Sequence, residues 1–378
     1  MARRRRSLVP VALALALSAG GAWVALRCRG PEALPPSTAP APSGRPFVVD
    51  VHVHLGPDGV ERLAGLMQRW QFDHVVNLSG GTPSRGLTEQ LAAARASKGR
   101  VTVFTTLSYH DVRFQDYGPR MALALRRAHA MGARGLKIAK LLGLGLPGPD
   151  EKLLPVDDPG LDPVFEAAGE LGMPVAIHSG DPRAFWLPVD SKNERKDELE
   201  AHPGWSQHGQ DVPSFDELLA QLERRVARHP KTTFISVHFG NAAEHPDRVA
   251  GWLRKYPNLY IDTAARIPEI GRHPPEQMRA FFVEFQDRIL YGSDLGVSAE
   301  PEPLFLGSEG KEPAGAKDEE RFFTATRRYF ETQDKDFDHP TPIQGNWKIS
   351  GVKLPDAVLR KIYGENARRV IRLDEAKP

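Results

Sequence analysis

The stretch VVDVHVHLG, residues 48–56, is an apolar run of β-strand residues interrupted by one acid and two histidines. Asp50, His52 and His54 occupy alternate positions, so in a strand all three side chains point to the same face. Placing three polar groups on one face is costly unless that face is solvated or something compensates their burial. The stretch therefore predicts a strand with a functional site on one face.

Seven further β-type runs follow, and helical patterns separate them. One of these patterns repeats apolar residues at Phe215, Leu218, Leu219 and Leu222, the spacing of a buried helix face. Alternating strands and helices predict parallel βαβ units, and eight strands predict a closed (β/α)8 TIM barrel of the α/β class. A doubly wound sheet is the alternative, disfavoured because no glycine-rich phosphate turn follows the first strand. The predicted strands are residues 47–55, 74–80, 101–108, 134–140, 174–180, 233–240, 259–265 and 289–294.

The chain from Pro46 onward is longer than the roughly 250 residues of a typical barrel. The excess is predicted as two long loops, residues 181–213 after strand five and residues 295–353 after strand eight. Both follow the C-terminal ends of strands, where barrel enzymes hold their active sites. We expect these loops to form lids or substrate walls.

The first 45 residues have the composition of a targeting segment. Residues 3–6 are all arginine, and a mostly apolar, uncharged stretch follows them at residues 8–26. This order predicts a signal peptide or membrane anchor at residues 1–30 and a Pro-rich linker at residues 31–45. The catalytic domain, residues 46–378, is then expected to be exported to the cell envelope. The alternative is that the apolar stretch forms a buried helix of the main domain.

Composition excludes several classes of protein. Hydrophobic residues make up 40% of the chain and charged residues 26%, as in globular proteins. The formal net charge is +2, much of it from the N-terminal arginines, so no surface for nucleic acid is expected. The single cysteine, Cys28, precedes the predicted catalytic domain, which therefore has neither an internal disulfide nor a thiolate metal site.

Ionisable residues recur in the middle or C-terminal half of five predicted strands, which places them at the same end of the barrel. Imidazoles with a carboxylate form a site suited to Zn, Mn or Fe rather than to Mg or Ca. Such an ion can lower the pKa of a bound water towards about 7. Asp294 could ligate the ion, accept the proton of that water, or do both in sequence. The recurring residues are His52, His54, Lys137, His178, His238 and Asp294.

These residues resemble the motifs of the amidohydrolase superfamily, and more closely those of its family-2 branch of TIM-barrel hydrolases and decarboxylases. The resemblance lies in Asp50-x-His52-x-His54, in AIHSGDP around His178, in VHFG around His238 and in RILYGSD at Asp294. The closing stretch LPDAVLRKIYGENARRVI, residues 354–371, is similar to the terminal helix of that branch. The likeness covers residues 46 to 372, almost the whole predicted domain.

The resemblance implies a set of roles for these residues. His52, His54, His178 and Asp294 would be metal ligands, with Asp50 orienting the site from behind. His238 would be either a ligand of a second metal or an acid/base beside the first. Lys137 would be a carboxylated bridge in a two-metal site, or otherwise a structural lysine or substrate binder. We expect one divalent ion, Zn more than Mn or Fe, and keep a second ion as the alternative.

Four further residues are candidate substrate contacts. Arg266 and Arg272 follow strand seven and could bind a carboxylate or phosphate, although an ion pair with Glu269 is the simpler reading. Asp181 and Trp186 begin the loop after strand five, which is either a lid or a surface loop anchored by aromatic residues. Lys140 has the opposite parity to Lys137, so no role in the barrel interior is expected for it.

These features predict an enzyme that acts on a small-molecule substrate. The first hypothesis is a metal-dependent hydrolase, in which metal-activated water attacks an amide, ester or lactone carbonyl. The alternative is a metal-dependent decarboxylase of an unsaturated or aromatic acid, with His238 assisting protonation of carbon. A non-catalytic binding protein of the cell envelope is a third hypothesis, but such a protein would be expected to have lost at least one candidate ligand.

Overall fold

The computed structural model describes residues 44–310 and 312–375, so the predicted signal or anchor at residues 1–30 lies outside the described residues. Within the described part, no helix combines the length and apolar character needed to cross a membrane. All eight runs predicted as strands contain one, and the eight strands pair in parallel in the order of the sequence. They are β1 (Val49–Leu55), β2 (His74–Asn77), β3 (Val101–Thr106), β4 (Gly135–Ile138), β5 (Val175–Ile177), β6 (Phe234–Ser236), β7 (Leu259–Asp262) and β8 (Ile289–Leu290).

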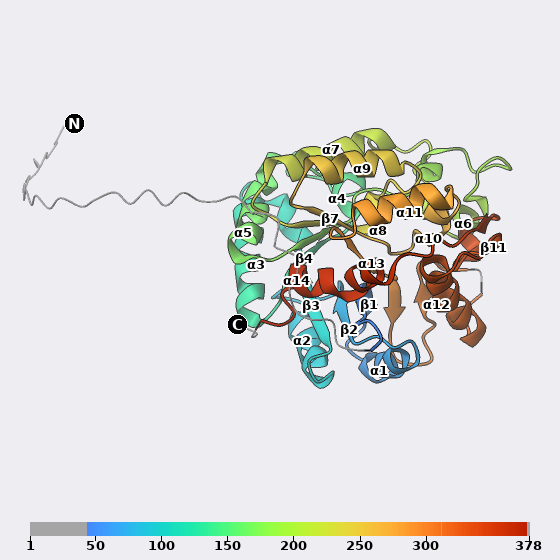
Figure 1. Cartoon of the computed structure of the whole chain (residues 1–378). Helices are drawn as coiled ribbons and strands as arrows, with labels where there is room; N and C mark the ends of the chain where they lie inside the picture. The colour runs from blue at the N-terminus through green and yellow to red at the C-terminus, as the bar shows by residue number, and fades with distance from the viewer. Residues whose placement is uncertain (1–43, 311, 376–378) are drawn as a thin grey trace, which may run out of the picture. The chain divides into compact units, whose positions relative to one another are not determined.

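The eighth strand is interrupted where the sheet returns to its start. β8 pairs with β7, whereas β9 (Leu295–Val297) pairs in parallel with β1, and the chain joins β8 to β9 directly. Two backbone hydrogen bonds link β1 to the joining residues, Val51 N to Tyr291 O (3.0 Å) and Asp294 N to His52 O (2.9 Å). A short strand, β10 (Phe305–Leu306), adds antiparallel to β9. The result is a curled, mainly parallel sheet of ten strands, consistent with a TIM barrel (Figure 1).

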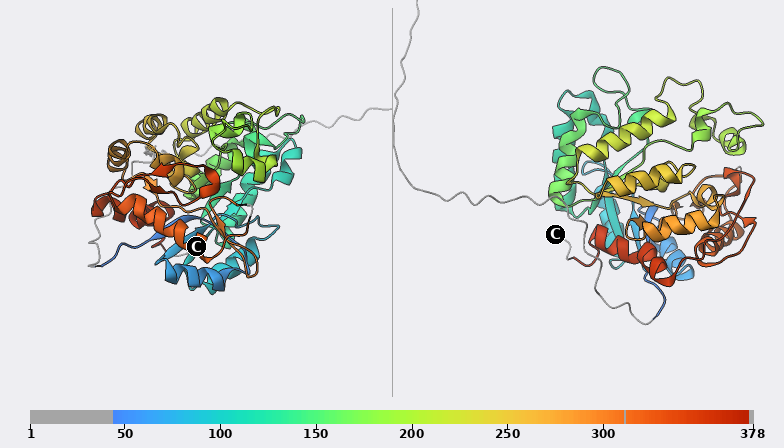
Figure 2. Two further views of the ribbon diagram at one scale, coloured as in Figure 1. Left: turned by 90° about the vertical axis from the view of Figure 1, so that its right-hand side faces the viewer. Right: turned by 45° about the horizontal axis from the view of Figure 1, so that its top comes forward.

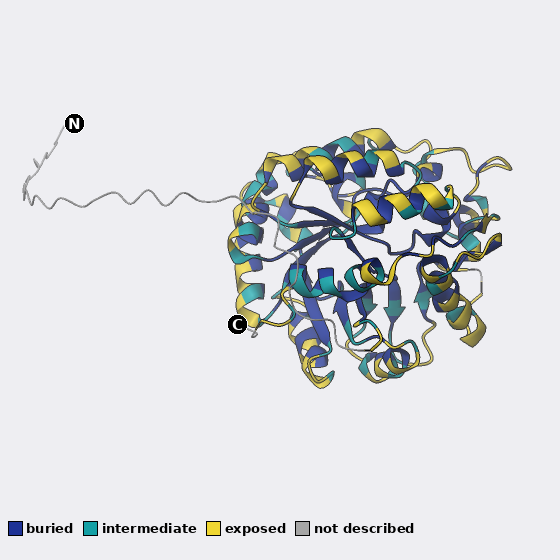
Figure 3. Cartoon of the chain, viewed as in Figure 1, coloured by how far each residue is buried: buried dark blue, intermediate teal, exposed yellow. Residues whose placement is uncertain are grey.

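Helices cover the outer face of this sheet and bury their apolar sides against it (Figure 3). α7 (Phe215–Arg228) buries Phe215, Leu218, Leu219 and Leu222, which is the pattern predicted for it. Burial of such an apolar stripe, rather than helix propensity, supplies most of the stability of helices of this length. The other long helices are α1 (Val60–Arg69), α2 (Leu87–Ala96), α3 (Tyr117–Met131), α5 (Asp162–Leu171), α9 (Pro246–Lys255), α11 (Pro275–Glu284) and α12 (Ala316–Glu331).

The two long segments after β5 and β8 differ from the loops expected there. The first contains η3 (Arg183–Trp186), α6 (Lys196–Ala201) and η4 (Pro203–Trp205). The second was expected as one long loop, and that expectation is wrong for its middle, which forms the 16-residue helix α12. α12 buries Phe322, Phe323, Tyr329 and Phe330, so its helical spacing of aromatic residues explains the difference. Two short strands, β11 (Phe337–Asp338) and β12 (Lys348–Ile349), pair beyond it.

The terminal helical segment packs against β1 and β8 (Figures 1 and 2). It consists of α13 (Asp356–Arg360), one π-helical turn at Lys361–Glu365 and α14 (Asn366–Ile371). The π turn leaves the Ile362 carbonyl free to accept a hydrogen bond from Tyr291 N (2.9 Å). Asn366 donates to the carbonyls of Gln286 (2.7 Å) and Ile289 (2.8 Å), at the start of β8. This segment therefore anchors the interrupted strand.

Candidate metal centre

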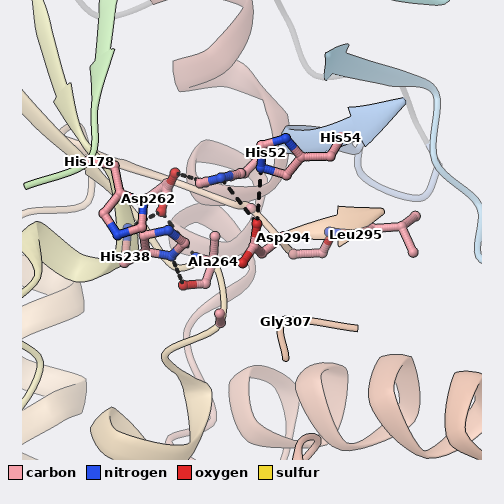
Figure 4. Close-up of polar contacts among 12 residues, drawn as sticks. His52, His54, His178, His238, Asp262, Ala264, Asp294, Leu295 and Gly307 are labelled. Carbon is pink, nitrogen blue, oxygen red and sulfur yellow. Dashed lines mark hydrogen bonds and ion pairs between the residues drawn. The ribbon is translucent and has the colours of Figure 1, made fainter. Parts of the chain in front are cut away.

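Four histidines and one aspartate converge at the C-terminal ends of the strands (Figure 4). His52 and His54 belong to β1, His178 follows β5, His238 follows β6 and Asp294 lies between β8 and β9. The ring centroids of His52 and His238 are 4.7 Å apart, and those of His178 and His238 are 4.3 Å apart. The structure thus brings together five of the six residues that the sequence pattern singled out, the sixth being Lys137.

Three of these imidazole rings are held by a hydrogen bond at Nδ1. The bonds join His52 Nδ1 to Asp262 Oδ2 (2.8 Å), His54 Nδ1 to Ser79 Oγ (2.7 Å) and His238 Nδ1 to the Ala264 carbonyl oxygen (3.0 Å). Carboxylate and carbonyl oxygens only accept, so Nδ1 carries the proton in neutral His52 and His238. The Nε2 atom of each of these two rings is then unprotonated, the state in which imidazole binds a metal.

The Asp294 carboxylate lies opposite the Nε2 atoms of His52 and His54. Its Oδ1 atom is 3.3 Å from His52 Nε2 and 3.4 Å from His54 Nε2. The ligand atoms of these three residues all lie within 4.8 Å of one another, close enough to hold a metal ion. His52, His238 and Asp262 form a second group that meets the same distance. The two groups share His52, and Asp262 in the second is already bonded to His52 Nδ1, so the first group is the better candidate for an ion.

The surroundings of His178 Nε2 indicate whether a metal fits these residues. Its Nε2 atom is buried and has no hydrogen-bond partner among the described residues. Asp181 Oδ1 is 4.0 Å away, too far for a hydrogen bond. A buried nitrogen without a partner costs free energy, which coordination to an ion would offset. The imidazole nitrogens and the carboxylate together fit Zn, Mn or Fe.

Burial sets the protonation states of the centre. It lowers the pKa values of His52, His178 and His238 well below that of free imidazole, because a charged ring would lose its hydration. Burial alone would raise the pKa of Asp294, but His52 and the hydrogen bond from His54 lower that pKa overall. Neutral imidazoles beside an ionised carboxylate are the states that ligate a divalent cation.

Lys137 is buried in β4, with Nζ 3.3 Å from His52 Nε2. Burial lowers the pKa of Lys137 to about 8, so an appreciable part of this amine is neutral near neutral pH. Its side chain faces the same cavity as His178 and Asp294. This position is compatible with either of two predicted roles, as a bridge between metals or as a substrate binder.

Asp50, the third polar residue of the β1 face, lies behind the centre rather than in it. It is fully buried, and its Oδ1 accepts hydrogen bonds from the backbone N–H of His52 (3.1 Å) and Ser293 (3.0 Å). Its Oδ2 contacts the Ser293 hydroxyl. Burial raises the pKa of Asp50 to about 7. Asp50 thus holds the backbone and hydroxyl of Ser293, the residue next to Asp294.

Residues at three strand ends adopt left-handed backbone conformations that non-glycine residues seldom take. The φ angle is 55° at His238, 54° at Ala265 and 69° at Asp294. Asp262 Oδ1 holds part of this backbone by accepting hydrogen bonds from the N–H groups of His238 (2.7 Å) and Ala264 (3.1 Å). Strained backbone of this kind clusters at functional sites, where it fixes the direction of a side chain.

A cavity of about 410 Å³ adjoins the metal centre. Phe185, Trp205 and Phe305 contribute aromatic surface to its wall. Lys140, Arg195 and Glu198 add charged groups. The predicted site residues in its wall are His54, Lys137, His178, Asp181, His238, Arg266 and Asp294.

Two predicted substrate contacts do not line this cavity. Trp186 donates from its indole nitrogen to the Pro213 carbonyl (2.9 Å) and packs edge-on against Phe215. Arg272 forms a bidentate ion pair with Glu194, at 2.6 and 3.0 Å. Both side chains are engaged within the protein, and we assign neither to the substrate.

Sequence reasoning missed Asp262 and misjudged Lys140. Asp262 ends the otherwise apolar strand β7, and an acid at such a position was the available signal. Lys140 was expected to face away from the interior, which is wrong, because its side chain lines the cavity. The parity argument failed because β4 ends at Ile138, after which side chains no longer alternate.

A barrel with histidines and an aspartate at its strand ends is the architecture of metal-dependent hydrolases and lyases. The amidohydrolase model, that of family 2, matches residues 49–373, and the chain belongs to this family. Divalent metal ions are the cofactors of this family, which is compatible with the His and Asp groups described above. A comparison with curated proteins found no significant match.

Solved structures of similar fold are distant in sequence. A dihydroxybenzoic acid decarboxylase from Polaromonas sp. JS666, with bound manganese and the inhibitor 2-nitroresorcinol, is 13% identical with a TM-score of 0.53, covering 88% of this chain and 98% of that one. A 2,6-dihydroxybenzoate decarboxylase from Rhizobium is 16% identical with a TM-score of 0.50, covering 88% of this chain and 100% of that one. An uncharacterised TIM-barrel protein from Bordetella bronchiseptica is 13% identical with a TM-score of 0.50, covering 86% and 99%. At these identities the likeness establishes the fold alone.

Proposed function

We propose that this protein is a metal-dependent hydrolase that acts on an amide, ester or lactone of a small anionic molecule. The observation that carries the proposal is the position of Asp294. Its carboxylate lies 3.3–3.4 Å from the Nε2 atoms of two histidines and lines the cavity. A carboxylate at this place can accept a proton from attacking water and return it to the leaving group.

The residues proposed to hold the metal are His52, His54, His178 and Asp294, with Asp262 and Asp50 orienting them from behind. The ion, for which we favour Zn, would supply Lewis acidity that polarises a carbonyl group and lowers the pKa of water. A single ion is favoured because Asp294 with His52 and His54 forms a compact set of ligands. A second ion on His238 remains the alternative, with Lys137 as its candidate bridge.

The charges of the cavity support an anionic substrate. Lys137, Lys140 and Arg266 all line the wall, the two lysines from the end of β4 and the arginine from the segment after β7. Lys140 is already paired with Asp181, whereas Arg266 has no carboxylate within 4.0 Å among the described residues. We therefore assign Arg266 to a carboxylate or similar anion on the substrate, where its planar fork can form two hydrogen bonds.

The second candidate function is decarboxylation of an aromatic or unsaturated acid. It is supported by the same unpaired Arg266, which could hold the carboxylate that leaves, and by the aromatic wall formed by Phe185, Trp205 and Phe305. In that reaction His238 would first take up a proton from solvent at Nε2, since Nδ1–H is held by the Ala264 carbonyl, and would then deliver that proton to carbon.

One experiment separates the two reactions. Protein reconstituted with Zn, or with Mn, is assayed against anionic amides, esters and lactones for hydrolysis, and against hydroxybenzoic and unsaturated acids for release of CO2. The Asp294→Asn variant serves as the control for contaminating activity. Hydrolysis without CO2 release supports the first function, and CO2 release supports the second. If the purified protein retains no stoichiometric metal and turns over neither class, both proposals fail.

We further propose that residues 1–30 export the protein, as a cleaved signal or as a retained anchor. The support is the order of arginines, apolar stretch and Pro-rich linker at the N-terminus. Bacterial cells that express the full chain are fractionated beside cells that express residues 44–378. Recovery of the full chain in the cytoplasm, in the same fraction as the shortened chain, would refute the assignment.

A further inference from the structure

Arg266 presents an unusual combination of burial and isolation. Its residue exposure is 6%, yet its guanidinium makes one hydrogen bond to the described residues, from Nη1 to the Ala265 carbonyl (3.0 Å). A buried charge without a partner is costly, and a guanidinium offers five N–H donors. We therefore expect the carboxylates near Arg266 to be held by other partners.

Several carboxylates lie near enough to act on Arg266 electrostatically, and each is engaged elsewhere. Asp181, Glu198 and Glu244 all favour its charged form. Lys140 Nζ holds both oxygens of Asp181, at 2.8 and 2.9 Å. Glu244 accepts a hydrogen bond from the backbone N–H of Arg183 (2.9 Å).

The third of these carboxylates, Glu198, and the neighbouring carboxylate of Glu269 are both paired with Arg195. Arg195 is fully buried, and its Nη1 lies 2.7 Å from Glu198 Oε2. Its Nη2 contacts Glu269 Oε1, and Glu269 lies three residues after Arg266 at the start of α10 (Ile267–Gly271). The second oxygen of Glu198 accepts a hydrogen bond from Ser308 Oγ (2.5 Å). Arg195 thus ties α6 to α10 at the wall of the cavity.

We propose that Arg195 is a positioning residue: by engaging Glu198 and Glu269, it keeps the guanidinium of Arg266 unpaired and available to an anionic group of the substrate. The inference rests on the proposed function, in which Arg266 binds that anion. It also revises the simpler reading of the sequence, in which Arg266 pairs with Glu269. Residues three apart at a helix start can pair, so without Arg195 the carboxylate of Glu269 has Arg266 as an accessible cation.

The four groups are balanced in charge, with two arginines and two glutamates. Glu198 favours the charged form of Arg266 from a distance without occupying its donors, whereas burial and the charge of Arg195 lower the pKa of Arg266. A purely structural ion cluster would stabilise the fold equally well whichever arginine each glutamate contacts. The proposal differs from that reading because it predicts a change in anion binding when Arg195 is removed and a recovery when the glutamates are neutralised.

The test compares benzoate with benzamide, which have similar shapes and differ in charge, by calorimetric titration of Zn-reconstituted protein. Arg266→Gln measures the preference for benzoate that comes from the metal and from the other cations of the cavity, among them Lys137 and Lys140. Arg195→Gln should lower the wild-type preference by about tenfold, to the level of Arg266→Gln, because a glutamate now occupies Arg266. The triple variant Arg195→Gln, Glu198→Gln, Glu269→Gln should restore the preference, since it frees Arg266 again. Crystal structures of the variants would locate the glutamates directly.

Arg195→Gln leaves two buried carboxylates without a cation and could fail to fold. The double variant Arg195→Gln, Glu198→Gln replaces one ion pair by amides and frees Glu269 alone, so it carries the same test. A folded variant that lacks Arg195, retains Glu269 and keeps the full preference for benzoate would overturn the proposal, as would a folded triple variant that fails to regain it. If the wild-type protein and Arg266→Gln prefer benzoate over benzamide equally, Arg266 does not bind the anion and the proposal fails. If the wild-type protein does not retain Zn but still prefers benzoate through Arg266, the proposed metal-dependent function is refuted. The inference about Arg195 then still stands.

Discussion

His52 Nδ1 and Asp262 Oδ2 lie 2.8 Å apart among fully buried residues of the site, linking β1 to β7 past the interrupted eighth strand. The same carboxylate accepts backbone hydrogen bonds from His238 and Ala264. It therefore fixes both the tautomer of one proposed ligand and the strained backbone of another candidate. We predict that Asp262→Asn weakens Zn affinity by about 10- to 100-fold, because the amide can present N–H where the ring needs an acceptor. Competition with a chromogenic chelator measures the change, and unaltered affinity would refute the role.

Replacement of Asp294 should remove catalysis while leaving the fold. Asp294→Asn keeps the shape of the side chain but lacks the basic oxygen, so turnover of whichever substrate is found should fall by about 10²–10⁴-fold. The thermal melting temperature of the metal-free variant should remain close to that of the metal-free parent. Turnover within a factor of two of the wild type would contradict the assignment of Asp294.

His178 should be required for metal retention. His178→Ala removes the buried Nε2 atom that has no protein partner, so we expect the metal content measured by elemental analysis to fall below stoichiometry. His110→Ala is the matched control, since His110 is exposed and lies outside the cavity. Equal metal content in the two variants would show that His178 is not a ligand.

Stability should decrease in mild acid because of His339. Burial lowers the pKa of this ring from 6.5 to about 4, and its Nδ1 accepts a hydrogen bond from Thr341 N (3.3 Å) that a proton would displace. Because the folded pKa lies below the unfolded one, the unfolded chain gains a proton that the folded protein resists. The free energy of unfolding should therefore fall as pH drops from 6.5 towards 4, by up to about 3 kcal/mol from this group. In His339→Asn the slope over this window should be smaller, and an unchanged slope in urea titrations would refute the prediction.

Gly364 should tolerate no side chain. A Cβ atom at this position would lie 2.0 Å from the Phe47 carbonyl oxygen, so Gly364→Ala must displace the terminal helical segment. We expect a loss of about 2–3 kcal/mol in the free energy of unfolding. Gly65→Ala in α1 is the control, because nothing lies within 4 Å of its Cβ and the change should stabilise the helix by up to about 1 kcal/mol. Urea denaturation of both variants decides whether the close approach or the loss of glycine itself matters.

The strand positions and the five converging residues could be predicted because their signals are local. Alternation in VDVHVHL marks a strand with one polar face, and helical spacing marks α7, whatever the rest of the chain does. Parallel strands in a barrel share one C-terminal face, so a residue such as His178 at a strand end is placed by topology alone.

The rest depends on contacts between distant segments, which a single sequence does not contain. The pairing of Arg195 with Glu269 joins residues 74 positions apart, and nothing near either residue favours it over pairing with Arg266. The cavity side of Lys140 depends on where β4 stops, and strand ends are the least certain feature of a sequence pattern. The sequence left Trp186 as either a lid residue or an anchor, because aromatic character does not distinguish a substrate wall from an anchor within a loop.

The barrel closes where β1 meets the residues that join β8 to β9, a region called here the seam. Asp294, the proposed proton acceptor, lies in the seam and bonds to β1 through its own backbone N–H. The two halves of the interrupted strand hold only two and three residues, and hydrogen bonds with β1 and with the terminal helical segment support them. Any fluctuation that parts β1 from the joining residues carries the carboxylate away from the histidines while the remaining strands stay paired. Activity is therefore expected to report local opening of the seam that global unfolding measurements do not detect.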